Sequence, residues 1–391
     1  QLTESRLHLW ILADGDDATD MLAKLSVIIG TLLDELERSG KSVGLATLCI
    51  ASGMGAQAFD RLSDSIDLPS LLNSQDAVTA WMQEASSTLG KLVGRLPGAV
   101  GSTSQLLMTL LPRLQSEAFP LEELVRNESR RSILGHIAQT PRETRSAEVM
   151  RIADRLSAGS GPTFGDLEVL NRHIPAIKQL NITGTGMFAG RPQLVVFNAS
   201  LTPQMDIARA AHISGSLPLV FKSPEERGHG FQTSTETTAF KDGGMLLNTP
   251  APGVVDRAFP ESPLTKSESL IVKFESDAAD ARTRSGSFFS SLADRITGVP
   301  HSAAGAFQDK KLEAFAEQIV TLPLKTEKGD FRGLLTGTVN FTMQDEQKQH
   351  LQAKARQVVD AHLERRTTAR EQHSFQSLSD AVLAMDDAML A

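Results

Sequence analysis

Gly40-Lys41-Ser42-Val43-Gly44 has the form G-x-S-x-G, which is typical of a nucleophile elbow. Glycines on both sides of the serine allow a sharp turn from a strand into a helix, and this turn exposes the hydroxyl group. The apolar run at 45–51 predicts a buried helix whose N-terminus points at Ser42. The motif therefore makes Ser42 a candidate nucleophile, with Gly40 and Gly44 as the glycines that shape the turn.

A second motif, Lys241-Asp242-Gly243-Gly244, places a carboxylate next to a Gly-Gly turn. Gly243 and Gly244 allow the backbone to approach another loop closely. A carboxylate at Asp242 can take the proton of a serine hydroxyl directly, so a Ser–Asp pair can transfer an acyl group. Both motifs also arise by chance, and Asp-Gly-Gly is a common turn.

The composition of the chain limits the classes of protein that it can belong to. With 391 residues and 40% hydrophobic content, the chain can form one large α/β domain or two smaller ones. The single cysteine, Cys49, excludes an internal disulfide and suits a reducing cytosol. A net charge of −8 argues against a nucleic-acid partner. The histidines show no spacing typical of metal ligands, so we expect no metal site.

Predicted strands and helices alternate along the chain. Because helices separate the strands, we predict an α/β fold with a mostly parallel sheet and helices on both faces. We predict strands at 7–12, 179–187, 193–198, 269–274, 318–322 and 338–341, and helices at 21–36, 165–177, 207–215, 345–373 and 374–390.

Two segments interrupt this alternation. Residues 55–150 contain amphipathic helical runs with polar and proline breaks, which predict a helical insertion after the elbow helix. This insertion is either a lid over an apolar pocket or part of the core, and we favour the core. Residues 276–309 are polar and rich in Ser, Ala, Arg and Gly, so we expect a mobile linker or surface loop.

The order of these motifs resembles that of the patatin-like phospholipase family. The segment 208–221 (ARAAHISGSLPLVF) is similar to the family's R-A-S-x-x-x-P-x-x-F segment, which also precedes the aspartate strand. Other stretches are similar to bacterial type III secreted phospholipase toxins of this family, and this likeness extends from about residue 45 to the end of the chain. These stretches are 51–54 (ASGM), 182–185 (ITGT), 191–200 (RPQLVVFNAS), 329–331 (GDF) and 340–343 (NFTM).

The resemblance implies a domain organisation. Residues 1–343 are expected to form the patatin-like phospholipase domain, with the insertion at 55–150 and the linker at 276–309. Residues 344–391 are expected to form C-terminal helices that lead to a membrane-binding domain outside this chain. We therefore expect the chain to be a homologue that is trimmed at both ends.

The resemblance also implies an activity and partners. It implies a phospholipase A2 and lysophospholipase toxin that hydrolyses ester bonds of membrane phospholipids with a Ser42–Asp242 dyad. It further implies type III secretion into a host cell, action in the host cytosol and at the plasma membrane, and binding to phosphoinositides. A secretion chaperone and host ubiquitin are the expected protein partners, and ubiquitin is expected to act as the activator in place of a cofactor.

One loop departs from the family pattern. The backbone amides of Gly15 and Val43 are the candidate donors to the oxyanion. The family has a glycine-rich loop, G-G-G-x-x-G, where this chain has Ala13-Asp14-Gly15-Asp16-Asp17-Ala18. Carboxylates there would oppose the negative charge of the transition state. The alternative is therefore a catalytically weak or inactive patatin-like scaffold that acts as a membrane or host-protein binding effector.

Other chemistries remain as alternatives. Asp14-Gly15-Asp16 resembles the D-x-D loop of haloacid-dehalogenase-type phosphatases, although Ala18 replaces the expected threonine or valine. Gly40-Lys41-Ser42 mimics the end of a P-loop, but Glu35 occupies the position of the first glycine and a helix precedes it.

Two further features have both a functional and a structural interpretation. His212 is the candidate base of a Ser–His–Asp triad, and we favour a structural hydrogen bond instead. The Lys and Arg residues of the helix at 345–373 could contact anionic lipid, but we favour a solvated helix face.

Overall fold

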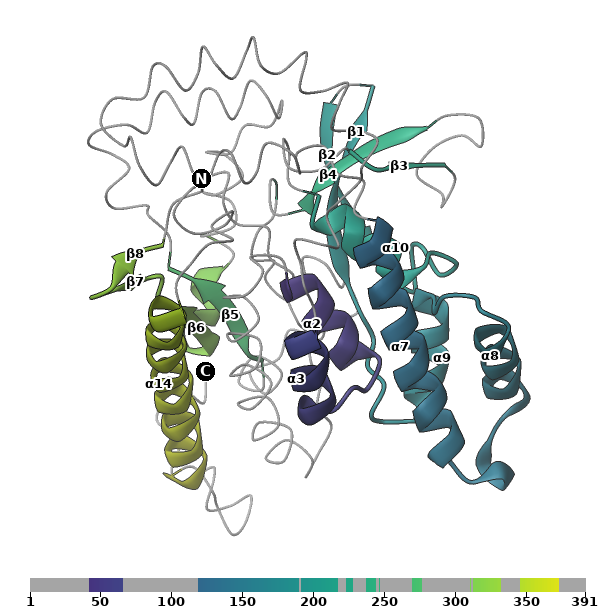
Figure 1. The fold of residues 1–391 in the computed structure, drawn as a ribbon, viewed down its shortest axis with the longest axis horizontal. Helices are drawn as coiled ribbons and strands as arrows, with labels where there is room; N and C mark the ends of the chain where they lie inside the picture. Colours follow the sequence, from purple (N-terminus) through teal and green to yellow (C-terminus); the bar gives the residue numbers. More distant parts are fainter. Residues whose placement is uncertain are drawn as a thin grey trace, which may run out of the picture.

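The computed structural model describes residues 42–65, 119–189, 191–216, 223–227, 237–243, 246, 269–275, 310, 312–331 and 345–372. Its helices and strands fall into two groups (Figure 1), one at 42–243 and one at 269–372. In chain order they are α2 (Ser42–Ala51), α3 (Ala56–Ser65), α7 (Phe119–Gln139), η3 (Arg142–Thr144), α8 (Ala147–Ser157), α9 (Phe164–His173), β1 (Ile182–Phe188), β2 (Arg191–Phe197), α10 (Ile207–Ser214), β3 (Glu225–Glu226), β4 (Thr238–Asp242), β5 (Ile271–Phe274), η5 (Glu313–Gln318), β6 (Ile319–Leu322), β7 (Lys325–Thr326), β8 (Gly329–Asp330) and α14 (Asp345–Gln372).

Most predicted elements that fall on the described residues are confirmed. The helices predicted at 165–177, 207–215 and 345–373 are α9, α10 and α14. The strands predicted at 179–187, 193–198, 269–274 and 318–322 are β1, β2, β5 and β6. The elements predicted at 7–12, 21–36, 338–341 and 374–390 lie outside the described residues, as do the linker at 276–309 and the middle of the predicted insertion.

The larger sheet has the strand order β2-β1-β4-β3 and is antiparallel throughout. The prediction of a mostly parallel sheet is therefore wrong for these strands. Only residues 189 and 190 separate β1 from β2, and a connection this short allows antiparallel pairing alone. Ala189 of this connection has φ 49°, a left-handed conformation typical of tight hairpins.

Parallel pairing occurs between β5 and β6, where Ile271 lies opposite Ile319. The helix α14 contacts β6, and buried side chains from both elements form a small core with Val320, Leu322, Ala355 and Val359. The hairpin of β7 and β8 follows β6 and also contacts α14 (Figure 1). The group at 269–372 is therefore organised around one side of a long charged helix.

The main core lies between the larger sheet and the helices α2, α7 and α10. The buried face of α10 packs on β1, where Gly184 leaves room for Phe197 and Ile213; a Cβ atom at Gly184 would lie 2.7 Å from the Phe197 ring. The rings of Phe197 and Phe240 are tilted by 56°, with centroids 5.8 Å apart. This packing joins β2 and β4 across β1.

The helix α7 falls within the predicted insertion and belongs to the main core. Its side chains Val125, Ile133 and Ile137 are buried in one cluster with Leu48 of α2. Because α7 contacts both α2 and α10, it supports these two helices. Residues 66–118, the middle of the predicted insertion, lie outside the described residues, so neither the lid nor the core interpretation is tested there.

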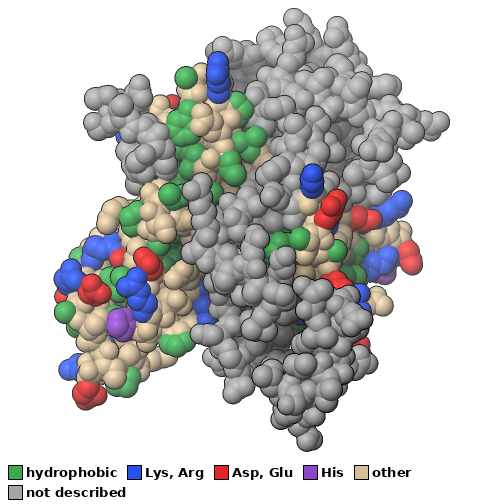
Figure 2. Space-filling view, turned by 180° about the vertical axis from the view of Figure 1, so that it is seen from behind, with side chains coloured by type: hydrophobic (Ala, Val, Ile, Leu, Met, Phe, Trp, Pro, Cys, Tyr) green, Lys and Arg blue, Asp and Glu red, His purple; other side chains and the backbone are tan. Residues whose placement is uncertain are grey.

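The surface of the described part is mixed in character. Figure 2 shows Lys, Arg, Asp and Glu side chains intermingled at the lower left, over the region of α7 to α9. Hydrophobic side chains gather at the upper left, over the region of β1 and β2, where Leu194 is 38% exposed. Within the described ranges, no helix has the length and apolar character needed to cross a bilayer.

Candidate active site

Ser42 is the first residue of α2. This helix includes the apolar sequence 45–51, of which Leu48, Cys49 and Ala51 are almost fully buried in the main core. The N-terminus of a helix carries unpaired N–H groups and a partial positive charge. Ser42 is therefore at the helix end that favours a developing anion. Its side chain, Gly40 and the candidate oxyanion donor Gly15 lie outside the described part of the chain.

Asp242 is the last residue of β4 and lies opposite Gly184 of β1. The next residue, Gly243, packs directly against the backbone of β1. A Cβ atom at Gly243 would overlap the backbone carbonyl group of Thr183. It would lie 2.5 Å from the carbonyl carbon and 2.6 Å from the side-chain Oγ1 of Thr183. The position after the aspartate thus has no room for a side chain. Gly244 and the Asp242 side chain are not among the described parts.

The helix α10 connects the elements that carry the two candidate residues. It contacts α2, which begins at Ser42, and it contacts β4, which ends at Asp242 (Figure 1). This helix comes from the segment 208–221, in which the small residues Ala208 and Ala210 are fully buried. Small side chains at these positions allow the neighbouring elements to approach α10 closely. The sequence therefore brings both motifs to one scaffold.

The C-terminus of α2 ends in a Schellman motif. The amide of Met54 donates to the carbonyl of Cys49 over 2.8 Å, and the amide of Gly53 donates to that of Ile50 over 2.9 Å. Gly53 has φ 80°, which is the left-handed conformation that this motif requires. The stretch at 51–54 (ASGM), one of those similar to the family, therefore forms the C-terminal cap of α2.

Neighbouring elements also hold the C-terminus of α2 in place. From α7, Ser132 Oγ donates to the carbonyl of Ser52 over 2.9 Å, and His136 Nε2 donates to the carbonyl of Gly53 over 2.7 Å. The amide of Lys178 donates to the carbonyl of Ala51 over 2.9 Å. These bonds satisfy carbonyl groups that a helix end leaves unpaired. The helix that begins at Ser42 is therefore fixed at its far end.

A buried ionic network lies between α7, α10 and β3, and Glu122 of α7 is at its centre. Glu122 is 7% exposed and accepts from His212 Nδ1 at 2.6 Å, Arg209 Nη1 at 3.1 Å and Arg126 Nη2 at 2.5 Å. Burial alone would raise the pKa of Glu122, but the His212 hydrogen bond, the charges of His212 and Arg209 and the Arg126 hydrogen bond lower it to about 2. Glu122 is therefore ionised at every physiological pH.

The network continues to two further carboxylates. Arg209 Nε donates to Glu226 of β3, and Arg126 Nε donates to Asp206 Oδ2 at 2.5 Å. Asp206 is also the N-cap of α10, where its side chain accepts from the amide of Ala208. The network thus attaches α10 to α7 at one side and to β3 at the other.

His212 is part of this network. Its side chain is 6% exposed, and its Nδ1 bonds to Glu122. From the sequence, a structural hydrogen bond is the favoured role of His212, in preference to the base of a triad. The bond to Glu122 is such a hydrogen bond. A His–carboxylate pair fixes the orientation of the ring and ties α10 to α7.

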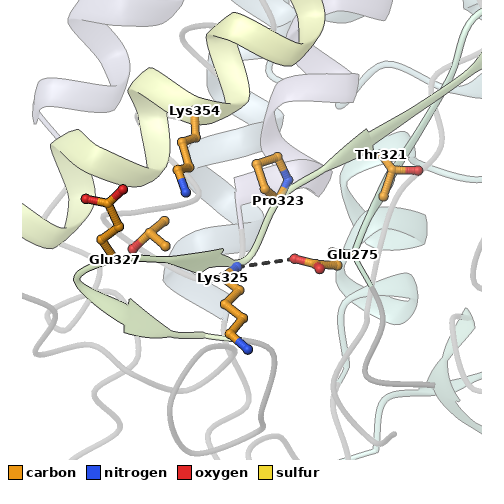
Figure 3. A pocket seen from close by; sticks show the side chains of 7 residues that line it. Glu275, Thr321, Pro323, Lys325, Glu327 and Lys354 are labelled. Carbon is orange, nitrogen blue, oxygen red and sulfur yellow. Dashed lines mark hydrogen bonds between the residues drawn. The ribbon is translucent and has the colours of Figure 1, made fainter. Parts of the chain in front are cut away.

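A separate groove of about 540 Å³ lies in the group at 269–372. Figure 3 shows it between α14 and the strands β6 and β7, with Lys354, Lys325, Glu327 and Glu275 on its walls. The Glu275 carboxylate is used structurally, because it accepts from the amides of Leu324 at 3.2 Å and Lys325 at 3.3 Å. The groove contains neither candidate catalytic residue. Among the residues with described placement, no group of His, Cys, Asp and Glu is arranged to hold a metal.

Sequence reasoning missed the ionic network. Glu122 and Arg126 are four residues apart in a helical run, so their own pair could have been predicted. The pair of Glu122 with Arg209 joins residues 87 positions apart, and a single sequence contains no signal for it. The tight contact of Gly243 with Thr183 also depends on strand register, which the motif alone does not reveal.

Solved structures of the type III effector protein ExoU are similar to this chain. One crystal structure of ExoU is 48% identical, over 94% of this chain and 56% of that chain, with a TM-score of 0.48. Full-length ExoU bound to full-length SpcU, from the type III secretion system of Pseudomonas aeruginosa, is 34% identical over 94% of this chain and 55% of that one, with a TM-score of 0.47. ExoU in a heterodimeric complex with SpcU is 36% identical, over 94% of this chain and 54% of the ExoU chain, with a TM-score of 0.48.

The chain spans just over half the length of these ExoU chains. No family model matches the chain, and no curated protein matches it. The likeness therefore depends on sequence identity across nearly all of this chain.

Proposed function

Because the chain belongs to the ExoU-like group of patatin-like effector proteins, we propose that it contains the catalytic part of a phospholipase. The proposed activity is that of a phospholipase A2 and lysophospholipase, which hydrolyses carboxylic ester bonds of membrane phospholipids. The proposed catalytic residues are Ser42 and Asp242. The protein is proposed to act as a secreted virulence effector inside a host cell.

One observation carries this proposal. The helix α10 packs against both α2, which begins at Ser42, and β4, which ends at Asp242. Two motifs 200 residues apart in the sequence are therefore attached to one small helix. Gly243, which has no room for a side chain, follows the aspartate and supports a fixed position for the end of β4.

In the proposed mechanism, Ser42 Oγ attacks the ester carbonyl while Asp242 takes the hydroxyl proton. The alkoxide of the leaving lysolipid then receives this proton, and the acyl group remains on Ser42. Water, deprotonated by Asp242, attacks the acyl-enzyme, and the fatty acid leaves as the proton returns to Ser42. The N-terminus of α2, including the amide of Val43, is suited to stabilise the oxyanion in both steps.

The proposed partners follow from the relatives. ExoU is seen in complex with SpcU, and we infer that the protein containing this chain also binds a secretion chaperone. We further propose that it acts in the host cytosol and at the plasma membrane, binds phosphoinositides and requires host ubiquitin as activator. No cofactor is invoked, because the dyad chemistry uses only the serine and the carboxylate.

Fatty-acid release from anionic phospholipid vesicles in the presence of ubiquitin tests the proposal. Ser42→Ala and Asp242→Asn, made in the full-length protein, are each expected to lower the rate by roughly 10⁴-fold, because they remove the nucleophile and the base. Ser157→Ala and Asp360→Asn, at exposed positions of α8 and α14, are the matched controls and should retain activity.

Two results would contradict the proposal. Release that persists in Ser42→Ala and Asp242→Asn would exclude the dyad. A full-length protein that binds the vesicles but releases no fatty acid would instead support the inactive binding scaffold, which the acidic loop at 13–18 suggests.

A further inference from the structure

Arg209 of α10 makes side-chain contacts with both α7 and β3. Its side chain is 19% exposed and contacts three groups on two other elements. Nη1 donates to Glu122 of α7 at 3.1 Å, Nε donates to Glu226 of β3, and Nη2 donates to the carbonyl of Glu225 at 3.2 Å. One guanidinium group thus bridges α7, α10 and β3.

The contacts with β3 lead directly to the strand of the candidate base. β3 has only two residues, and Glu225 and Glu226 lie opposite Ala239 and Thr238 of β4. The amide of Phe240 adds a bond of 2.8 Å to the carbonyl of Pro224. So short an edge strand has few backbone bonds of its own, and the Arg209 side chain fixes both of its residues. Asp242 is the last residue of the strand that β3 supports.

The contact with Glu122 leads to the helix of the candidate nucleophile. Glu122 belongs to α7, and further along α7 the side chains of Ser132 and His136 hold the C-terminus of α2. In addition, α10 itself contacts α2. Arg209 therefore links the helix that holds α2 to the strand that pairs with β4.

We propose that Arg209 is a positioning residue that fixes β4, and with it Asp242, relative to the helix that begins at Ser42. This role rests on the proposed Ser–Asp function. The fork of a guanidinium group suits the role, because it presents donors in fixed directions to several acceptors at once, which a lysine ammonium cannot do. Because Glu122 stays ionised at physiological pH, it remains a charged acceptor for Arg209.

Arg126 provides a matched control within the same network. Its side chain is 24% exposed, and it also donates to Glu122. In the part of the chain that the structure describes, its other charged partner is Asp206 at the start of α10, whereas the partners of Arg209 include β3. Replacing either arginine leaves Glu122 with one partner fewer, but only the replacement of Arg209 releases β3.

The first measurement compares kcat and KM of the full-length protein with Arg209→Lys, Arg209→Gln, Glu226→Gln and Arg126→Gln. The Arg209 and Glu226 variants should lose about 100-fold in kcat with little change in KM, because a small displacement of a catalytic group costs about this much. Arg126→Gln should lower the melting temperature as much as Arg209→Gln does, yet keep kcat close to that of the unsubstituted protein.

The second measurement is amide hydrogen exchange, which does not require activity. The amides of β4 should exchange faster in Arg209→Gln and Glu226→Gln than in Arg126→Gln. Equal exchange of the β4 amides in all three variants would overturn the positioning role, whether or not the protein hydrolyses lipid. An equal loss of kcat in Arg209→Gln and Arg126→Gln would also overturn it. If the unsubstituted protein releases no fatty acid, this result contradicts the proposed function. The positioning role of Arg209 is then decided by the hydrogen-exchange comparison.

Discussion

Gly243 shows how closely a single residue can constrain the candidate site. Gly243 follows the last residue of β4 and packs against the carbonyl group of Thr183, a residue of β1 that pairs with Val196 of β2. An alanine at this position must either displace β1 or change the direction in which the chain leaves Asp242. The structure thus explains why glycine follows the aspartate.

Gly243→Ala is expected to lower the free energy of unfolding by about 3 kcal/mol, because overpacking against backbone cannot be relieved by a side-chain rotation. Urea denaturation measures this change. Gly135→Ala is the control, since Gly135 is exposed in α7 and a Cβ atom there would meet nothing within 4 Å. The control should be more stable than the unsubstituted protein by up to about 1 kcal/mol, because alanine favours the helix. Equal stability of the two variants would contradict the packing described for Gly243.

At this scale, the sequence predicts residues that carry a local motif and misses residues whose role depends on distant partners. Ser42 and Asp242 stand out because glycines flank them in a fixed pattern. Glu122 looks like any helical glutamate, and its importance appears only when folding brings Arg209 and His212 to it. A buried polar network cannot be predicted from one sequence when its members come from different elements.

At the scale of elements, apolar runs predict helices and strands well, while their pairing is harder to predict. The run at 45–51 predicts α2, and the β-branched runs predict β1 and β2. The prediction of parallel pairing failed for β1 and β2 because it used the average alternation of strands and helices. The short connection at 189–190 is the local feature that determines antiparallel pairing.

The helix α14 offers a prediction about pH. His362 lies on its buried side, 2% exposed, and its Nε2 has no hydrogen-bond partner among the described residues. Burial and the nearby charges of Arg366 and Arg365 lower the pKa of His362 from 6.5 to about 4. Between these values the unfolded chain binds a proton that the folded chain does not. The stability contributed by neutral His362 is therefore full above pH 6.5 and is lost as the pH falls toward 4.

The free energy of unfolding should fall by up to about 3 kcal/mol across this range because of His362. His362→Gln should remove this part of the pH dependence, and urea unfolding of the two proteins at about pH 7 and about pH 4.5 measures it. His350→Gln, on the same helix but partly exposed, is the control and should keep the dependence. An unchanged pH dependence in His362→Gln would show that His362 is hydrated in the folded protein. Ionised Glu122 also contributes to the free energy of unfolding. Because its pKa is lowered from 4.5 to about 2, this contribution is lost only as the pH falls below 4.5.

At the scale of the whole molecule, the described elements form two groups, each with its own core. The core formed by α2, α7, α10, β1, β2 and β4 includes the elements that carry the two candidate residues, while α14 and its strands form a separate small core. The chain spans just over half the length of the ExoU chains to which it is similar. The proposed activation by ubiquitin and the proposed membrane binding are therefore to be tested on the full-length protein.

The central claim is that Ser42 and Asp242 act on one substrate as nucleophile and base. The most direct test is to treat the full-length protein, with ubiquitin and anionic vesicles present, with a fluorophosphonate probe and to map the modified residue by mass spectrometry. We predict modification at Ser42, with the labelling rate lowered by about 100-fold or more in Asp242→Asn because the base is lost. Modification at another residue, or a rate that Asp242→Asn leaves unchanged, would contradict the claim.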